Sequence, residues 1–171
     1  MARHRLPHDL LENFQVGMDR MIDEWGPYQK GPIINLGAGK KMISNTEALD
    51  LPHWRAGDRM PYDDETVGGI IAYHFFEHLK KEEIIEVLWE CERVLMFSAP
   101  INIVIPHWDT EAAHQDLDHK SFWSESTWRN LFLNPYYEGS MPRDWHLKEV
   151  CTVIMGLVQR NLVIVSQLVK E

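Results

Sequence analysis

The sequence predicts an α/β fold with a mostly parallel sheet that ends in an antiparallel hairpin. Short apolar runs, typical of strands buried on both faces, alternate with segments of helical periodicity. Strands that alternate with helices usually pair in parallel. The last two runs have only the turn-like Gln159-Arg160-Asn161 between them, which is too short for a parallel crossover. The expected strands are 33–36, 48–51, 67–73, 101–105, 151–158 and 162–169.

Two longer segments have the spacing of helices that bury one face. We expect a helix over 9–25, ended by Gly26-Pro27, and a second helix over 80–95. Ser124 can cap a third helix that carries Trp128. The apolar stripe of the second helix consists of Ile84, Ile85, Leu88, Cys91, Val94 and Leu95.

Length, charge and cysteine content limit the classes of protein to which the chain can belong. The 171 residues, 44% of them hydrophobic, predict a single domain over 1–171 with a sizeable core. A net charge of −9 repels phosphate backbones and argues against nucleic acid as a partner. Cys91 and Cys151 form no metal-type pair and favour buried thiols in a reducing, cytoplasmic compartment. The apolar stretch 150–169 is interrupted by polar residues, which argues against a membrane span.

The segment 32–40 predicts a ligand site. An apolar strand breaks into Gly37-Ala38-Gly39, where glycine permits a tight turn and a close approach of ligand to backbone. The third glycine of a dinucleotide fingerprint is replaced by Met42, which weakens a nicotinamide interpretation. Ligands of open α/β sheets bind beyond the carboxyl ends of the strands. The expected crevice therefore gathers Gly37–Lys40, Asp50, His74–His78 and His107.

The order of these features resembles class I S-adenosylmethionine-dependent methyltransferases, in particular the small type 11-like branch found in bacteriophages. The resemblance covers 32–137, and each motif is weak alone, but their order and spacing are specific. It implies a Rossmann-like methyltransferase sandwich with a cofactor half at about 32–95 and a lid and C-terminal hairpin at about 96–171. The matching motifs are Asn35–Gly39, Ala48–Asp50, Met60–Val67, Tyr73–Leu79 and His119–Trp123.

The resemblance implies S-adenosylmethionine as cofactor and a role for each matching position. Asn35 belongs to the motif in which Gly37, Ala38 and Gly39 would let the backbone approach the methionine moiety. Asp50 would accept hydrogen bonds from the ribose hydroxyls. The remaining cofactor positions are Asp58, Arg59 and Met60 beside the adenine, and Tyr73 and His74 beneath the sulfonium.

The chain departs from the family pattern between its first strands. Gly37 and Asp50 are only thirteen positions apart, which leaves no room for a full crossover helix. Between Asp50 and Asp58 there is little room for another strand and helix. We therefore expect a reduced sheet and a more open cofactor site. A homodimer is a reasonable consequence of such a sheet.

Methyl transfer from a sulfonium needs mainly alignment, with a general base for some oxygen or nitrogen acceptors. His78, His74 and His107 are the candidate bases, because histidine has a suitable intrinsic pKa. A structural hydrogen bond at a strand-to-helix turn is the competing interpretation of His78, and Glu77 could orient a neighbour or cap the following helix. The expected acceptor is a small or medium-sized molecule.

The loop 107–119 holds three Asp and several His and is open to three interpretations. It could be a substrate lid, solvated loop polarity or a divalent metal site. The match of His119-Lys120 to a family motif favours a lid or structural role, so we assign no metal ligand. Asn134-Pro135-Tyr136-Tyr137 resembles a motif of DNA adenine methyltransferases, but it follows a helix, so a helix stop is the better interpretation.

Two other functions remain open at this point. A non-catalytic methyltransferase-like module could use exposed sheet edges for protein or self-association. A metal-dependent hydrolase could use the loop 107–119, although this is the weaker idea.

Overall fold

The computed structural model describes residues 30–171 except 41–42, 135–139, 143–144, 156–160 and 171. The helix predicted at 9–25, the helix stop at Pro135 and the turn at Gln159-Arg160 lie outside the described residues.

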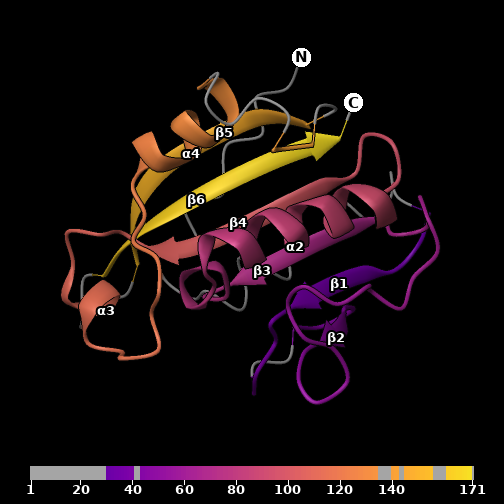
Figure 1. Ribbon diagram of the computed structural model, residues 1–171, viewed down its shortest axis with the longest axis horizontal. Coiled ribbons are helices and arrows are strands. Elements are labelled where there is room, and N and C mark those ends of the chain that lie inside the picture. The colour runs from indigo at the N-terminus through magenta and orange to yellow at the C-terminus, as the bar shows by residue number, and fades with distance from the viewer. Residues whose placement is uncertain (1–29, 41–42, 135–139, 143–144, 156–160, 171) are drawn as a thin grey trace.

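Six strands form one mixed sheet in the order β2-β1-β3-β4-β6-β5 (Figure 1). The first four strands pair in parallel, and β6 pairs antiparallel with both β4 and β5. The predicted parallel sheet with an antiparallel C-terminal hairpin is therefore confirmed. The strands are β1 (Ile33–Leu36), β2 (Glu47–Leu49), β3 (Gly69–Tyr73), β4 (Pro100–Pro106), β5 (Trp145–Met155) and β6 (Asn161–Lys170).

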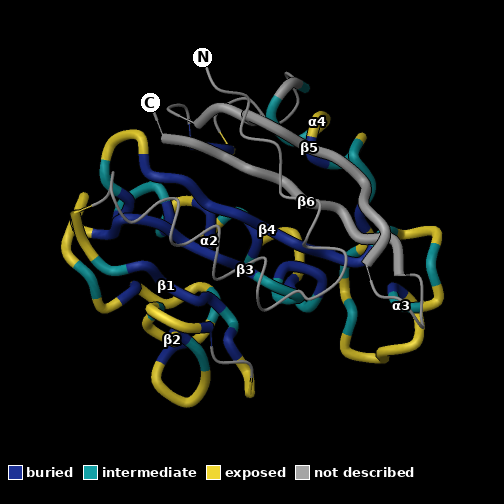
Figure 2. The backbone as a smooth tube through the Cα atoms, turned by 180° about the vertical axis from the view of Figure 1, so that it is seen from behind, coloured by how far each residue is buried: buried dark blue, intermediate teal, exposed yellow. Residues whose placement is uncertain are grey.

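The central strands carry the core of the sheet. Every residue of β1 and β4 is buried, as are the first four residues of β3. This burial accounts for the unbroken apolar runs, because a strand covered on both faces has no solvent side for polar residues. Figure 2 shows β1, β3 and β4 as buried tubes, whereas β2 at the edge is largely exposed.

Helix α2 (Lys81–Val94) lies across β3 and β4 (Figure 1). It begins where the Lys80 backbone N–H donates to the Glu83 carboxylate at 2.7 Å, half of a capping box. Its predicted stripe is directed into the core, where Leu88, Cys91 and Val94 are fully buried. Burial raises the pKa of the Cys91 thiol, so this cysteine is an inert core residue.

Three short helices follow β3 and β4, and buried aromatic rings pack between them. The helices are η3 (Phe76–His78), α3 (Glu111–His114) and α4 (Glu125–Leu133). The predicted cap of α4 is confirmed, since the Ser124 hydroxyl accepts from the Thr127 backbone N–H. Trp123 and Trp128 are buried with ring centroids 4.6 Å apart, and Phe76 packs edge-on against both.

The structure corrects several predicted boundaries. The second strand spans Glu47–Leu49 rather than 48–51, because the chain turns at Asp50, whose carbonyl accepts from the backbone N–H of His53. The third strand begins at Gly69, and Val67 makes only an isolated bridge to Leu95. The fifth strand begins at Trp145, six residues before the predicted start, because β6 supplies pairing partners as far as Lys170.

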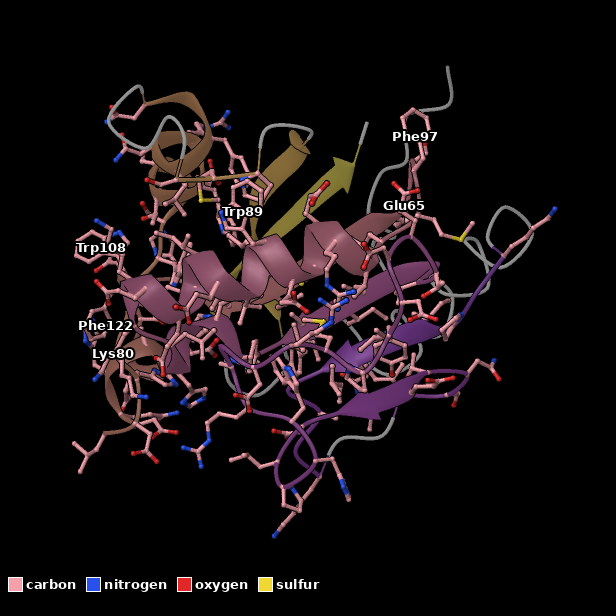
Figure 3. The ribbon with its side chains drawn as sticks, turned by 45° about the vertical axis from the view of Figure 1, so that its right-hand side comes forward. Glu65, Lys80, Trp89, Phe97, Trp108 and Phe122 are labelled. Atoms are coloured by element: carbon pink, nitrogen blue, oxygen red, sulfur yellow. The ribbon has the colours of Figure 1, made fainter. Side chains whose placement is uncertain are left out.

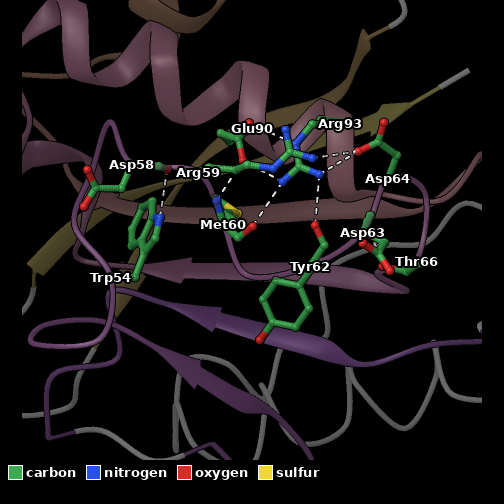
Figure 4. A network of polar contacts seen from close by, with 10 residues as sticks. All are labelled: Trp54, Asp58, Arg59, Met60, Tyr62, Asp63, Asp64, Thr66, Glu90 and Arg93. Atoms are coloured by element: carbon green, nitrogen blue, oxygen red, sulfur yellow. Dashed lines mark hydrogen bonds and ion pairs between the residues drawn. The ribbon is translucent and has the colours of Figure 1, made fainter.

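The reduced connection between β2 and β3 is held by ionic contacts rather than by a helix (Figure 4). The Arg93 guanidinium on α2 donates to the carbonyls of Met60 and Tyr62 and to the carboxylates of Asp64 and Glu90. Glu90 also accepts from the Met60 backbone N–H at 2.8 Å. Arg93 holds the pKa of Glu90 below its usual range. This ion-pair network therefore fixes the segment 58–64 against α2.

Candidate functional site

The predicted site residues collect at the carboxyl edge of the parallel strands. Gly37 follows β1, Asp50 follows β2, His74 follows β3 and His107 follows β4. The parallel register places these four strand ends along one edge, on the side of the molecule where α3 lies (Figure 1). This is the edge at which open α/β sheets bind their ligands.

The glycine turn after β1 uses its two glycines differently. Gly37 has φ +68°, and a Cβ at this position would overlap the ring of Phe75. Gly39 has φ +53°, and a Cβ there would meet none of the described residues within 4 Å. Gly37 is therefore required by internal packing, whereas Gly39 leaves open space in which a ligand can approach the backbone.

Asp50 locks this turn from the neighbouring strand. Its Oδ2 accepts from the Gly39 backbone N–H at 2.6 Å, and its Oδ1 accepts from the Leu51 backbone N–H at 2.7 Å. The backbone N–H of Gly37 donates to the Leu49 carbonyl at 2.9 Å. A carboxylate has about four lone-pair sites, so about two remain for a ligand diol. The half-exposed carboxylate and the open space at Gly39 fit the ribose and methionine parts of S-adenosylmethionine.

Other predicted cofactor residues differ in how accessible they are. Asn35 in β1 and Ala38 within the turn are buried. Asp58 is exposed, and Arg59 is exposed with Nη2 at 3.5 Å from Asp64. Met60 is only 1% exposed and belongs to the core. Solvent therefore reaches two members of the predicted adenine group, Asp58 and Arg59, but not the Met60 side chain.

Trp54, which no sequence motif contained, and Phe75, which lay in a motif without an assigned role, shape this part of the site. Trp54 is buried, and its indole N–H donates to the Asp58 carbonyl at 3.0 Å. Its ring centroid lies 6.1 Å from that of Phe75, the residue packed against Gly37. The position of a Trp between Asp50 and Asp58 was the available signal. Trp54 shapes the loop that follows Asp50.

His74 and Glu77 form a hydrogen-bonded pair at the end of β3. The imidazole Nδ1–H of His74 donates to Oε1 of Glu77 at 2.7 Å, and the Glu77 residue is 1% exposed. His74 has φ +52°, a left-handed conformation that histidine adopts more often than most residues, and its backbone N–H donates to the Val104 carbonyl. This tautomer leaves the lone pair on Nε2 of an imidazole that is 30% exposed.

Tyr73 lies directly before this pair. Burial, and then the charge of Glu77, raise the pKa of its phenol above the usual range. Its ring meets the His74 ring edge-on at 4.3 Å between centroids. Tyr73 therefore stays neutral and limits the positions open to the His74 imidazole.

The two other candidate bases are placed differently. Nδ1 of His107 accepts from the Asp109 backbone N–H at 3.2 Å, so a loop contact already uses its lone pair. His78 lies next to Glu77 in η3 and meets the ring of His119 at 4.7 Å between centroids. Of the three, His74 alone is paired with a buried carboxylate through Nδ1.

The predicted loop 107–119, which follows β4, and the residues directly after it carry exposed aromatic rings. Trp108 and Phe122 are both 51% exposed, and His114 stacks on Phe122 at 4.7 Å. Figure 3 shows Trp108 and Phe122 on one side of the molecule, whereas Phe97 and Glu65 lie at the other end. The loop thus places apolar surface at the carboxyl edge, as a lid or an acceptor-binding wall requires.

No protein-family model and no curated protein matches the chain. In the part of the chain that the structure describes, no helix is long and apolar enough to cross a membrane.

The chain is similar to several solved structures. An S-adenosylmethionine-dependent methyltransferase from Archaeoglobus fulgidus is 15% identical over 95% of this chain and 97% of its own, with a TM-score of 0.58. One from Methanosarcina mazei is 11% identical over 88% and 96%, with a TM-score of 0.63. A putative methyltransferase from Haloferax volcanii, in complex with the Trm112 activator, is 10% identical over 99% of both chains, with a TM-score of 0.56. The chain therefore has the Rossmann-like fold of S-adenosylmethionine-dependent methyltransferases.

Proposed function

We propose that the protein binds S-adenosylmethionine along the carboxyl edge of the sheet and directs methyl transfer to an oxygen or nitrogen of a small or medium-sized acceptor. The observation that carries this proposal is the glycine turn closed by Asp50, with open space at Gly39 and unused lone pairs on the carboxylate. When bound, the cofactor supplies a methyl group already activated on a sulfonium. The assignment to the small type 11-like branch rests on the order of the sequence motifs.

The residues of the chain have distinct roles in this proposal. Gly39 admits the methionine moiety against the backbone, and Asp50 accepts from the ribose hydroxyls. Asp58 and Arg59 are the accessible groups on the adenine side. Asn35, Ala38 and Met60 support the turn and the loop from the core, while Tyr73 and His74 lie at the end of β3.

His74 is the general base that the geometry favours for acceptors that must lose a proton. The buried Glu77 carboxylate orients the imidazole through Nδ1 and would stabilise it once it gains a proton at Nε2. His78 and His107 are the alternatives, but Nδ1 of His107 already accepts a backbone hydrogen bond. Trp108 and Phe122 supply apolar surface for an acceptor on the same side.

Calorimetric titration with S-adenosylhomocysteine tests the proposal directly. The wild-type protein is expected to bind in the micromolar range. Asp50→Ala is expected to weaken binding about 100-fold, because hydrogen bonds to a charged group contribute about 1.5 to 3 kcal/mol each. Asp63→Ala, which removes an exposed carboxylate away from the turn, is the matched control and should bind as the wild type does. A folded wild-type protein that does not bind millimolar S-adenosylhomocysteine contradicts the proposal.

A second candidate function is a non-catalytic module for protein or self-association. The short edge strand β2, with Glu47 and Ala48 exposed, favours it because an unpaired edge offers backbone groups to another chain. This alternative predicts a dimer by light scattering and a melting temperature that S-adenosylhomocysteine does not change.

A further inference from the structure

Glu77, His78 and His119 come together although the sequence separates His119 from the other two. A carboxylate oxygen of Glu77 and one nitrogen from each histidine all lie within 4.8 Å of one another. Donor atoms around a tetrahedral Zn²⁺ lie about 3.4 Å apart, given metal–ligand distances of about 2.1 Å. Small side-chain rotations would therefore bring the three groups to coordination distance.

One oxygen of the buried Glu77 carboxylate lacks a hydrogen-bond partner among the described residues, and a bound cation would compensate its charge. Its side chain is 2% exposed, and Oε1 accepts from His74. Oε2 is buried and has no hydrogen-bond partner among the described residues. A buried charged oxygen without a partner is costly, and native structures usually supply a donor or an ion.

His119 is held in the tautomer that a metal ligand requires. Its Nδ1 lies 2.8 Å from the Ala113 carbonyl, an acceptor that only an N–H can serve. In the neutral ring the lone pair is therefore on Nε2. A backbone carbonyl bound to the second ring nitrogen is a common support of histidine ligands.

The backbone fixes His119 beside η3. The N–H groups of Lys120 and Ser121 both donate to the Glu77 carbonyl, at 2.7 and 3.1 Å. The Ser121 hydroxyl donates to the Phe76 carbonyl at 3.0 Å. The two segments that supply the ligands are thus joined by three hydrogen bonds and need no ordering when an ion binds.

We propose that Glu77, His78 and His119 form a binding site for a divalent transition-metal ion at the carboxyl edge of the sheet, next to His74. Two imidazoles and one carboxylate are a ligand set for zinc, iron or cobalt rather than for magnesium, which prefers oxygen ligands. Three protein ligands leave positions on the ion for water or for an oxygen or nitrogen ligand. This inference does not rest on the proposed methyl transfer.

Zinc titration of the full chain, expressed without a histidine tag and stripped with EDTA, tests this site. Wild-type protein is expected to bind one Zn²⁺ with micromolar or tighter affinity and to melt at a higher temperature with Zn²⁺ present. Stripped protein loaded with Co²⁺ should show a visible absorption spectrum. His78→Gln and His119→Gln should each weaken Zn²⁺ binding at least tenfold. His53→Gln, at an exposed histidine outside the cluster, is the matched control and should bind as the wild type does.

Two results would overturn the proposed metal site. Zn²⁺ binding that both variants leave unchanged would place the ion on other histidines, and a folded wild-type protein that binds no Zn²⁺ would rule the site out. Near-ultraviolet circular dichroism checks that each variant is folded. S-adenosylhomocysteine binding by the stripped protein reports on the cofactor site separately.

Discussion

The two halves of the carboxyl edge are built in different ways. The half around Gly39 and Asp50 consists of a tight turn and a three-residue edge strand, held by hydrogen bonds between backbone N–H groups and one carboxylate. The half around His74 and Glu77 rests on longer buried strands and on the packed rings of Phe76 and Trp123. The first half leaves space for a ligand beside Gly39, whereas the second half holds the His74 and Glu77 side chains to each other by a hydrogen bond.

The largest expected effect comes from substitution of the two turn glycines. Gly37→Ala should lower the free energy of unfolding by about 2 to 4 kcal/mol, because the new Cβ overlaps Phe75 and φ is positive. Gly39→Ala should cost only about 1 kcal/mol, from its positive φ alone, yet weaken S-adenosylhomocysteine binding. Urea unfolding and calorimetry measure the two effects. Equal destabilisation by both variants would contradict the division of roles.

In the half around His74 and Glu77, the Ser121 hydroxyl joins two segments of the chain. Ser121 donates to the Phe76 carbonyl and accepts from the buried Trp123 indole N–H at 2.8 Å. Ser121→Ala should lower the free energy of unfolding by about 1 to 2 kcal/mol, because the indole N–H loses its partner. It should also weaken Zn²⁺ binding while leaving S-adenosylhomocysteine binding unchanged. Ser126→Ala, on the surface of α4, serves as the control. A Zn²⁺ affinity identical to wild type would show that this hydroxyl does not support the cluster.

The ion pair between Arg93 and Glu90 should make the stability of the protein depend on pH. Arg93 lowers the pKa of Glu90 in the folded protein. The resulting stability is present above the ordinary carboxyl pKa and is lost as pH falls through the lower folded value. Between about pH 5 and the acid limit, wild type should therefore lose more stability than Glu90→Gln does. Thermal unfolding at a series of pH values measures this difference, and parallel curves would argue against it.

Much of the fold follows from local pattern. Buried parallel strands appear as unbroken apolar runs, so the positions of β1, β3 and β4 can be predicted without knowledge of their neighbours. The spacing between the last two runs predicts the antiparallel hairpin. The start of β5 could not be predicted, because the polar residues from Trp145 onward join the sheet only through pairing with β6.

The residues of the candidate site also fall into two groups, those that local pattern predicts and those that only tertiary contacts place. The sequence by itself determined the glycine turn, Asp50 and the histidines at the strand ends, because the carboxyl edge of a parallel sheet gathers residues that directly follow strands. Only the tertiary structure decided that Met60 lies in the core, that Glu77 is buried beside His74, and that His119 meets His78. These facts depend on contacts between distant segments, which no local periodicity encodes. Periodicity reports the burial of a segment, whereas the partner of a buried polar group depends on the whole packed fold.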